Sequence, residues 1–245
     1  MRQWQGKRYW LVGASEGLGR EVAFCLSRVG AEVIVSARNE DRLKELVAAL
    51  PGKASFVTLD VTDAAAVQAA ADQIGPIDGV VYLAGVYWPM KASEWDISRV
   101  DQMGEINYLG AGRVVGSVIH GMIARGHGHI VLTGSLSGFR GLPGAIGYGA
   151  SKAGIMYLAE SMQADLRGTG IDVQLVNPGF IKTRLTEKND FYMPFIMEPE
   201  IAAREFFEHM NDDAFKKSFP LVFSWMFRLS QFLPDWAYYR LFGGR

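Results

Sequence analysis

The strongest guide to the fold is a set of three glycines between a predicted strand and a predicted helix. Residues 9–12 are apolar and are followed by Gly13, Gly17 and Gly19. Apolar positions at helical spacing come next, and a second apolar strand covers residues 32–37. A strand, a glycine turn, a helix and a strand within about 30 residues form the βαβ unit of a dinucleotide-binding fold. Glycines there let the backbone approach a pyrophosphate at the positive end of a helix.

The same alternation of strand and helix continues down the chain. Further strands are predicted over residues 55–59, 79–83, 129–133 and 172–176, and helices over residues 42–50, 64–74, 101–125 and 148–168. Apolar, β-branched strands separated by helices predict a parallel sheet covered on both faces. The expected fold class is α/β, a single Rossmann-type doubly wound parallel sheet with a hydrophobic C-terminal helical extension. Ligands of such sheets bind beyond the carboxyl ends of the strands.

Composition and charge fit one large domain and exclude several classes of function. The 245 residues are 49% hydrophobic, which supports a large buried core in one α/β domain. The net charge of −1 and the lack of a basic run argue against nucleic acid as a partner. Cys25 is the only cysteine, so no internal disulfide can form and a reducing, cytoplasmic location is expected. We find no signal peptide, no run of about 20 apolar residues and no acidic pair beside the histidines, so we expect no spanning helix and no metal site.

A tyrosine and a lysine open the helix predicted over residues 148–168. Positions four apart share a helix face, so the Tyr148 phenol and the Lys152 ammonium can converge on one spot. A free tyrosine ionises near pH ~10 and is a poor acid or base at neutral pH. A fixed cation a few Å away would lower that pKa. Such a pair alone is most often a solvent-exposed feature of a helix with no function. It can act in catalysis only together with a cofactor and a group that orients the substrate.

Short motifs follow the predicted strands in a definite order. They are the turn from Gly13 to Gly19, Asp60 with Val61, Ala84 with Gly85, Asn107, Ser135, Tyr148 with Lys152, and Pro178 with Gly179 through Thr183. In this order and spacing the chain resembles a short-chain dehydrogenase/reductase over about residues 7–185. Val12 departs from the family pattern, which usually has threonine there, and Tyr82 and Leu83 replace two asparagines. These positions mainly brace the sheet, so we interpret them as a repacked support layer.

The resemblance implies a role for each motif residue. Tyr148 would be the acid/base for a carbonyl oxygen, Lys152 would bind the nicotinamide ribose and lower the Tyr148 pKa, and Ser135 would hold that oxygen. Asn107 would bend its helix and hold a water that links Lys152 to solvent. The implied catalytic residues are Asn107, Ser135, Tyr148 and Lys152. The implied dinucleotide-binding residues are Gly13, Ser15, Glu16, Gly17, Leu18, Gly19, Arg38, Asp60, Val61, Ala84, Gly85, Asn107, Tyr148, Lys152, Pro178, Gly179, Ile181 and Thr183.

Each motif residue also has a purely structural interpretation. Ser135 lies among glycines and serines typical of a turn, and Asp60 precedes an ordinary signal for the start of a helix. Two functions therefore stay open. One is an oxidoreductase that interconverts a carbonyl and an alcohol, and the other is a non-catalytic dinucleotide-binding regulator or scaffold. The intact set of Ser135, Tyr148 and Lys152 favours the enzyme, for which the family implies a homodimer or homotetramer.

The end of the second predicted strand favours NADP(H) over NAD(H). An acidic residue there would bind the ribose 2′-hydroxyl and repel a 2′-phosphate. The chain has Arg38 instead, whose guanidinium suits a phosphate, and Ser15 would add a hydroxyl donor. Glu16 opposes this preference, because the resemblance implies a basic residue at that position in many members that prefer NADPH. We expect Arg38 to outweigh Glu16 if the Glu16 side chain faces solvent.

A segment rich in large apolar residues follows the last motif. Residues 185–199 predict an apolar lid, and residues 186–212 of the single domain 1–245 are assigned to the substrate lid region. Its apolar residues are Phe191, Tyr192, Met193, Pro194, Phe195, Ile196 and Met197. Further candidates for the wall of a pocket are Trp88, Met90, Phe139, Leu142 and Ile146. These side chains predict a bulky hydrophobic carbonyl or alcohol as the substrate.

The motifs do not cover the apolar extension, residues 213–245. Pro220 would open and Pro234 would end a helix of about 14 residues or roughly 21 Å, too short to cross a bilayer. A narrow polar stripe on it consists of Ser224, Arg228 and Gln231. An aromatic segment with Arg240 and Arg245 at its edge follows. Two interpretations stay open: the apolar face packs on the body or a second subunit, or it lies on a membrane surface as a peripheral contact.

Overall fold

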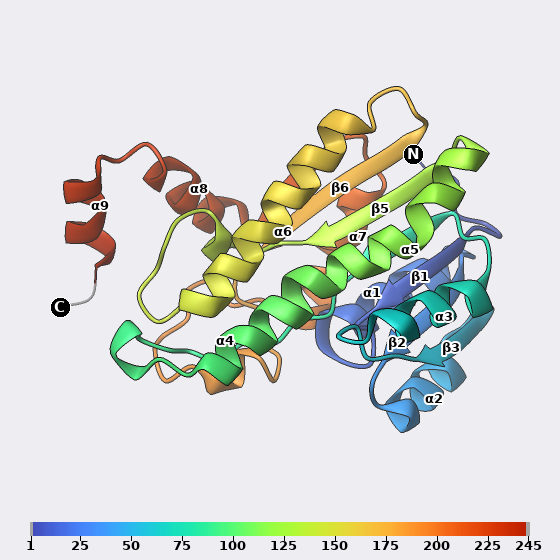
Figure 1. Cartoon of the computed structure of the whole chain (residues 1–245), viewed down its shortest axis with the longest axis horizontal. Helices are drawn as coiled ribbons and strands as arrows, with labels where there is room; N and C mark the ends of the chain where they lie inside the picture. The colour runs from blue at the N-terminus through green and yellow to red at the C-terminus, as the bar shows by residue number, and fades with distance from the viewer. Residues whose placement is uncertain (1, 244–245) are drawn as a thin grey trace.

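The fold is a single parallel sheet with helices on both faces (Figure 1). The computed structural model describes residues 2–243, and Arg245 lies outside them. Within that range seven strands pair in the order β3-β2-β1-β4-β5-β6-β7, every neighbouring pair parallel. The strands are β1 (Arg8–Val12), β2 (Glu32–Ala37), β3 (Ala54–Thr58), β4 (Gly79–Tyr82), β5 (Gly128–Thr133), β6 (Ile171–Pro178) and β7 (Lys216–Phe219). The predicted Rossmann-type doubly wound sheet is confirmed.

Two hydrophobic layers hold the helices to the sheet. One layer joins it to α3 (Ala64–Ile74), α5 (Gly110–Arg125) and α6 (Ile146–Asp165). The other joins it to α1 (Gly17–Arg28), α2 (Glu40–Ala49) and α7 (Pro199–Met210). Because both faces are covered, strands such as β4 and β5 are buried along their whole length. Strand order reverses between β1 and β4, so their carboxyl ends frame the crevice where ligands of such sheets bind.

The helix predicted over residues 101–125 is interrupted. The structure has α4 (Ile97–Met103), then a π-helical turn (Gly104–Leu109), then α5. Asn107 lies in this turn and is fully buried. The Tyr82 hydroxyl donates a hydrogen bond of 2.5 Å to the Ile106 carbonyl in the same turn. Tyr82, one of the two departures from the family pattern, thus supports the wider turn from the sheet below it, and π-turns of this kind often occur at functional sites.

Sequence analysis missed α7 and β7. The predicted lid region, residues 186–212, includes α7, which packs against α1 and buries Ala202 and Phe206. The prediction of a lid therefore applies only to the segment before Pro199. β7 lies in the extension and pairs with β6, with Ser218 opposite Asn177. Its four residues show no clear alternation of apolar and polar side chains, so they carry no strand signal.

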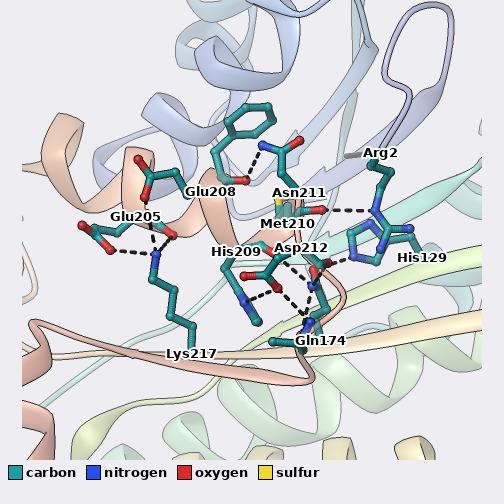
Figure 2. Close-up of polar contacts among 12 residues, drawn as sticks. Arg2, His129, Gln174, Glu205, Glu208, His209, Met210, Asn211, Asp212 and Lys217 are labelled. Carbon is teal, nitrogen blue, oxygen red and sulfur yellow. Dashed lines mark hydrogen bonds and ion pairs between the residues drawn. The ribbon is translucent and has the colours of Figure 1, made fainter.

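A buried amide joins the last elements of the sheet (Figure 2). The Gln174 Nε2 atom, on β6, donates to the carbonyl oxygens of His209, Asp212 and Ala214 at 2.8, 3.0 and 3.1 Å. Its Oε1 atom lies 2.8 Å from Nε2 of His129 on β5. These bonds hold the turn between α7 and β7 against the sheet. The partners are distant in sequence, and no local pattern indicates them.

The C-terminal extension forms two short helices after β7. They are α8 (Leu221–Ser230) and α9 (Asp235–Phe242), each preceded directly by a proline. α8 is shorter than the predicted helix, because the chain turns after Ser230. Phe223 and Phe227 pack against Leu136, so one side of α8 contacts the body of the domain. No helix within residues 2–243 is long and apolar enough to cross a membrane.

Candidate functional site

A cleft of about 690 Å³ opens at the carboxyl ends of the strands, across the point where the strand order reverses. It is lined by every predicted dinucleotide-binding residue except Asn107: Gly13, Ser15, Glu16, Gly17, Leu18, Gly19, Arg38, Asp60, Val61, Ala84, Gly85, Tyr148, Lys152, Pro178, Gly179, Ile181 and Thr183. The structure therefore brings together residues that are far apart in sequence. Lining residues that sequence analysis did not name include Asn39, Arg42, Thr133, Gly134, Arg184 and Thr186.

The glycine turn lies against the loop that follows β4. Gly13 has a φ of +92°, and a Cβ atom there would lie 2.3 Å from the backbone nitrogen of Ala84. A Cβ on Gly19 would lie 2.3 Å from the Gly13 carbonyl oxygen. Only glycine fits at these two positions. The turn thus brings bare backbone and the N-terminus of α1 to the cleft, an arrangement suited to a phosphate group.

Tyr148 and Lys152 lie on the first turns of α6 and face the cleft, with Lys152 buried. The Lys152 Nζ atom donates a hydrogen bond of 2.8 Å to the carbonyl oxygen of Thr133 at the end of β5. It lies 5.8 Å from the centre of the Tyr148 ring. Ser135 is buried two residues beyond β5, and its hydroxyl oxygen accepts a 2.9 Å hydrogen bond from the Ser137 hydroxyl. Three of the four predicted catalytic side chains therefore lie together, with Tyr148 and Lys152 lining the cleft and Ser135 beside Tyr148.

Burial dominates the ionisation of this group. It raises the pKa of Tyr148 to about 12, although the neighbouring Ser135 hydroxyl acts in the opposite direction. Burial also lowers the pKa of Lys152 to about 8. The Lys152 ammonium, which bonds to the Thr133 carbonyl, does not offset this effect in the structure, because desolvation of the phenolate prevails. Tyr148 is a protonated phenol at neutral pH.

Asn107 does not line the cleft but supports it from behind. Its Oδ1 atom accepts from the Val86 backbone nitrogen at 2.8 Å, and its Nδ2 atom donates to the Val86 carbonyl at 3.0 Å. Nδ2 also donates to the Ser151 hydroxyl at 2.9 Å. Asn107 thereby ties the loop after β4 to α6, beside Lys152. Asn107 therefore has a positioning role between this loop and α6, and its contact with a cofactor stays a prediction.

The arginine-rich end of the cleft contains more than the predicted Arg38. Arg42, on the first turn of α2, also lines the cleft. Its guanidinium donates to the Glu16 carboxylate at 2.5 Å. Arg184 binds the other oxygen of Glu16, with its Nε atom at 2.9 Å. Glu16 therefore does not simply face solvent, as the cofactor prediction assumed, but is neutralised by two guanidinium groups.

Tyr87 connects the catalytic tyrosine to the lid, and sequence analysis missed it. Its ring lies 5.0 Å from the Tyr148 ring, measured between centroids, in an edge-to-face arrangement. Its hydroxyl donates to Asn189 Oδ1 at 2.9 Å, and its carbonyl accepts from Lys188 Nζ at 2.8 Å. The predicted neighbour Trp88 instead stacks with the Lys188 ammonium, 4.5 Å from the ring centre. No spacing rule distinguishes Tyr87 from Trp88 in a loop.

An apolar wall adjoins Ser135. It is formed by Leu136, Phe139, Leu142, Phe180, Phe223 and Phe227. Phe139 and Leu142 were predicted wall residues, whereas Met90 is buried beside Ala145 and Ile146 is the first residue of α6. The predicted lid residue Phe195 packs on Phe223, with ring centroids 5.6 Å apart. The lid, the wall and α8 therefore form one apolar neighbourhood beside the catalytic group.

Comparison with known proteins agrees with this site. The family described as short chain dehydrogenase matches residues 7–191. An uncharacterised oxidoreductase of Myxococcus xanthus is 37% identical over 232 residues, which cover 92% of each chain. The 3-oxoacyl-(acyl-carrier-protein) reductase of Thermotoga maritima is 33% identical over 196 residues, 75% of this chain and 78% of the relative. A solved short chain dehydrogenase/reductase family protein has a TM-score of 0.82 at 26% identity, covering 89% of this chain and 97% of its own. The protein is therefore an oxidoreductase that belongs to the short-chain dehydrogenase/reductase family.

Proposed function

We propose that the protein is an NADP(H)-dependent oxidoreductase that interconverts a carbonyl and an alcohol on a hydrophobic substrate. The observation that carries the proposal is that Tyr148 and Lys152 line the cleft together, with the Ser135 hydroxyl beside the Tyr148 phenol. A non-catalytic regulator or scaffold would need the cleft but not a protonated phenol and an ammonium group beside it. The geometry therefore favours the enzyme over that alternative.

The residues of the cleft fit a phosphorylated dinucleotide. The cradle at Gly13 has no room for a side chain, and the hydroxyl of Thr133 is buried without a hydrogen-bond partner among the described residues. Arg38 and Arg42 would hold a 2′-phosphate at one end, and the amide groups near Gly179 and Thr183 would hold the nicotinamide carboxamide at the other. Arg42 strengthens the preference for NADP(H), because it adds a second guanidinium to the same end.

The protein's own groups supply a proton and hold the reacting oxygen. The nicotinamide, when bound, supplies or accepts the hydride. Tyr148 donates its phenolic proton to the carbonyl oxygen in reduction, or accepts a proton from the alcohol in oxidation. Ser135 donates a hydrogen bond to the same oxygen and keeps it in line with the phenol. Lys152 contributes a positive charge that favours the phenolate left after proton transfer.

The apolar wall and lid support a hydrophobic substrate. Leu136, Phe139 and Phe180 belong to one apolar cluster with Phe223. From the lid, Phe191 packs on Phe180 and Phe195 packs on Phe223. A pocket of this kind accepts an alkyl or aromatic group and offers few polar partners to a small polar substrate. The name of the relative from Thermotoga maritima, a 3-oxoacyl-(acyl-carrier-protein) reductase, supports a chain-bearing ketone as one class to test.

The test is a screen of ketones and aldehydes for oxidation of NADPH and of NADH by the purified full-length protein. The proposal expects turnover with bulky hydrophobic carbonyls, faster with NADPH, and lost in Tyr148→Phe. Tight dinucleotide binding with no turnover of any carbonyl or alcohol would support the regulator instead. Sedimentation of the same sample would test a homodimer or homotetramer, which we propose from the family relationship alone.

A further inference from the structure

α8 has apolar side chains on its outward side as well as on the side that packs against the body. Ser224, at 0% exposure, points into the protein, and its hydroxyl bonds to the Leu221 carbonyl of its own helix. Val222 is 72% exposed on the opposite side, together with Trp225 and Leu229. A water-facing helix normally has the reverse distribution, because burial of apolar side chains stabilises the fold. The outer side of α8 is therefore typical of a surface that contacts another molecule.

The exposed side continues across the turn into α9. We define the C-terminal apolar surface by its nine exposed residues: Leu221, Val222, Trp225, Met226, Leu229, Phe232, Trp236, Tyr239 and Leu241. Scattered exposed apolar residues are ordinary, but a gathered set on consecutive elements indicates a contact surface. Figure 1 shows α8 and α9 extending from one end of the sheet, away from α1, α2 and α3.

Arg140 fixes this surface in place. Its guanidinium donates to the carbonyl oxygens of Ser230 and Leu233, both at 2.7 Å, and to the Asp235 carboxylate at 2.5 Å. It also lies 3.9 Å from the centre of the buried Tyr238 ring. The turn and α9 are thus tied to the loop that connects Ser135 with Tyr148. The surface is presented in one orientation and is not a loose tail.

The charges on these two helices favour a negatively charged layer. Between residues 220 and 243 the charged side chains are Arg228, Asp235 and Arg240. Asp235 pairs with Arg140, whereas Arg228 and Arg240 pair with no acidic group among the described residues. Arg228 lies 5.6 Å from the Trp225 ring centre. Tryptophan and tyrosine with arginine at the edge of an apolar surface are typical of helices that lie in the headgroup region of a bilayer.

We propose that the C-terminal apolar surface binds an anionic lipid bilayer as a monotopic contact. No described helix can cross a membrane, so α8 and α9 would lie in the plane of the interface. The inner side of α8 places Phe223 against Phe180 and Phe195, next to the catalytic group. A hydrophobic substrate would then reach the site from the lipid phase. This last point rests on the proposed function, while the lipid contact itself does not.

The test is flotation of the full-length protein with vesicles of phosphatidylcholine alone or mixed with phosphatidylglycerol. The wild type is expected to float with the mixed vesicles. Val222→Ser combined with Leu229→Ser should lower that binding at least ~10-fold, because two aliphatic groups leave the bilayer. Ile123→Ser with Ile201→Ser, an exposed aliphatic pair on α5 and α7, is the matched control and should not change it. Truncation after Ser218 is less informative, because it also removes the packed Phe223 and Phe227.

Charge and catalysis are tested separately. Arg228→Gln with Arg240→Gln should weaken binding to the mixed vesicles and leave binding to phosphatidylcholine alone unchanged. Tyr148→Phe should float like the wild type, so that failure of the catalytic proposal leaves this one intact. Wild type that stays unbound to both vesicles would overturn the inference. A dimer in sedimentation that dissociates in the Val222 and Leu229 variant, without vesicle binding, would also overturn it and identify a second copy as the occupant.

Discussion

Arg184, in the loop after β6, donates a hydrogen bond of 2.9 Å to the carboxylate of Glu16 in the glycine turn. Because Arg42 occupies the other carboxylate oxygen, Glu16 joins the two rims of the cleft at the end where Arg38 lies. Glu16 argued against NADP(H) binding when the sequence was considered alone. In the structure, its negative charge lies between two guanidinium groups. Its effect on the cofactor can be measured directly.

Glu16→Gln is expected to strengthen NADPH binding by about fivefold, or ~1 kcal/mol for partly exposed charges. The substitution removes a negative charge near the 2′-phosphate and frees Arg42 to bind it. NADH, which lacks that phosphate, should change less. Titration of both dinucleotides checks this, with Glu45→Gln on the exposed face of α2 as the control. Weaker NADPH binding in the variant would mean that Glu16 mainly orients Arg42.

Arg38→Asp is expected to weaken NADPH by a few kcal/mol, on the order of what a desolvated phosphate contact contributes. The change removes a guanidinium and adds repulsion, while NADH affinity should be unchanged or improved. Arg204→Asp, an exposed position on α7, controls for the change in net charge. Preference of the wild type for NADH in the same titration would show that the cofactor assignment is wrong.

Tyr148→Phe should abolish turnover, by at least ~100-fold, while NADPH still binds. The phenol is the proton donor, whereas the glycine turn and Asp60 do not depend on it. Lys152→Ala should reduce both turnover and cofactor binding, because Lys152 lies against the cleft as well as beside Tyr148. Fluorescence titration together with a turnover assay separates the two effects. Substantial activity of the Tyr148→Phe variant on any substrate would contradict the proposed mechanism.

Burial of Lys152 should also appear in the pH dependence of stability. Its pKa falls from 10.5 to about 8 in the folded protein, so between these values the unfolded chain binds more protons. The free energy of unfolding therefore rises with pH across this window. Lys152→Met cannot titrate, so the wild type should gain on the order of 3 kcal/mol relative to it between neutral pH and 10.5. Urea unfolding of both proteins across this range checks the slope, and parallel curves would contradict it.

Substitution of two glycines of α5 by alanine should change the stability of the protein in opposite directions. A Cβ at Gly110 would lie 2.5 Å from the Tyr82 hydroxyl oxygen, so Gly110→Ala should destabilise by ~1–3 kcal/mol through overpacking. A Cβ at Gly112 would meet nothing within 4 Å, so Gly112→Ala should stabilise by ~0.5–1 kcal/mol. Urea unfolding compares them. Equal responses would show that the contact between α5 and Tyr82 does not govern this helix.

The sequence by itself determined six of the seven strands of the sheet, the position of the cleft and most of the residues that line it. Periodic apolar runs indicate strands and helices, and in a parallel doubly wound sheet the residues after each strand meet at one edge. This is why Gly13, Asp60 and Gly85 could be placed at the cleft before any contact was known. The order of the motifs also identified Tyr148 and Lys152 as partners on one helix face.

Only the tertiary structure decided which groups face one another across the fold. It showed that burial raises the pKa of Tyr148, that Glu16 is held by Arg42 and Arg184, and that Tyr87 links the catalytic group to the lid. It also buried Ser224 and Ser230 of α8 together with Phe223 and Phe227, and left Val222, Trp225 and Leu229 exposed. Desolvation, ion pairing and the choice of a packed face depend on neighbours far away in sequence, and a local pattern contains no information about them.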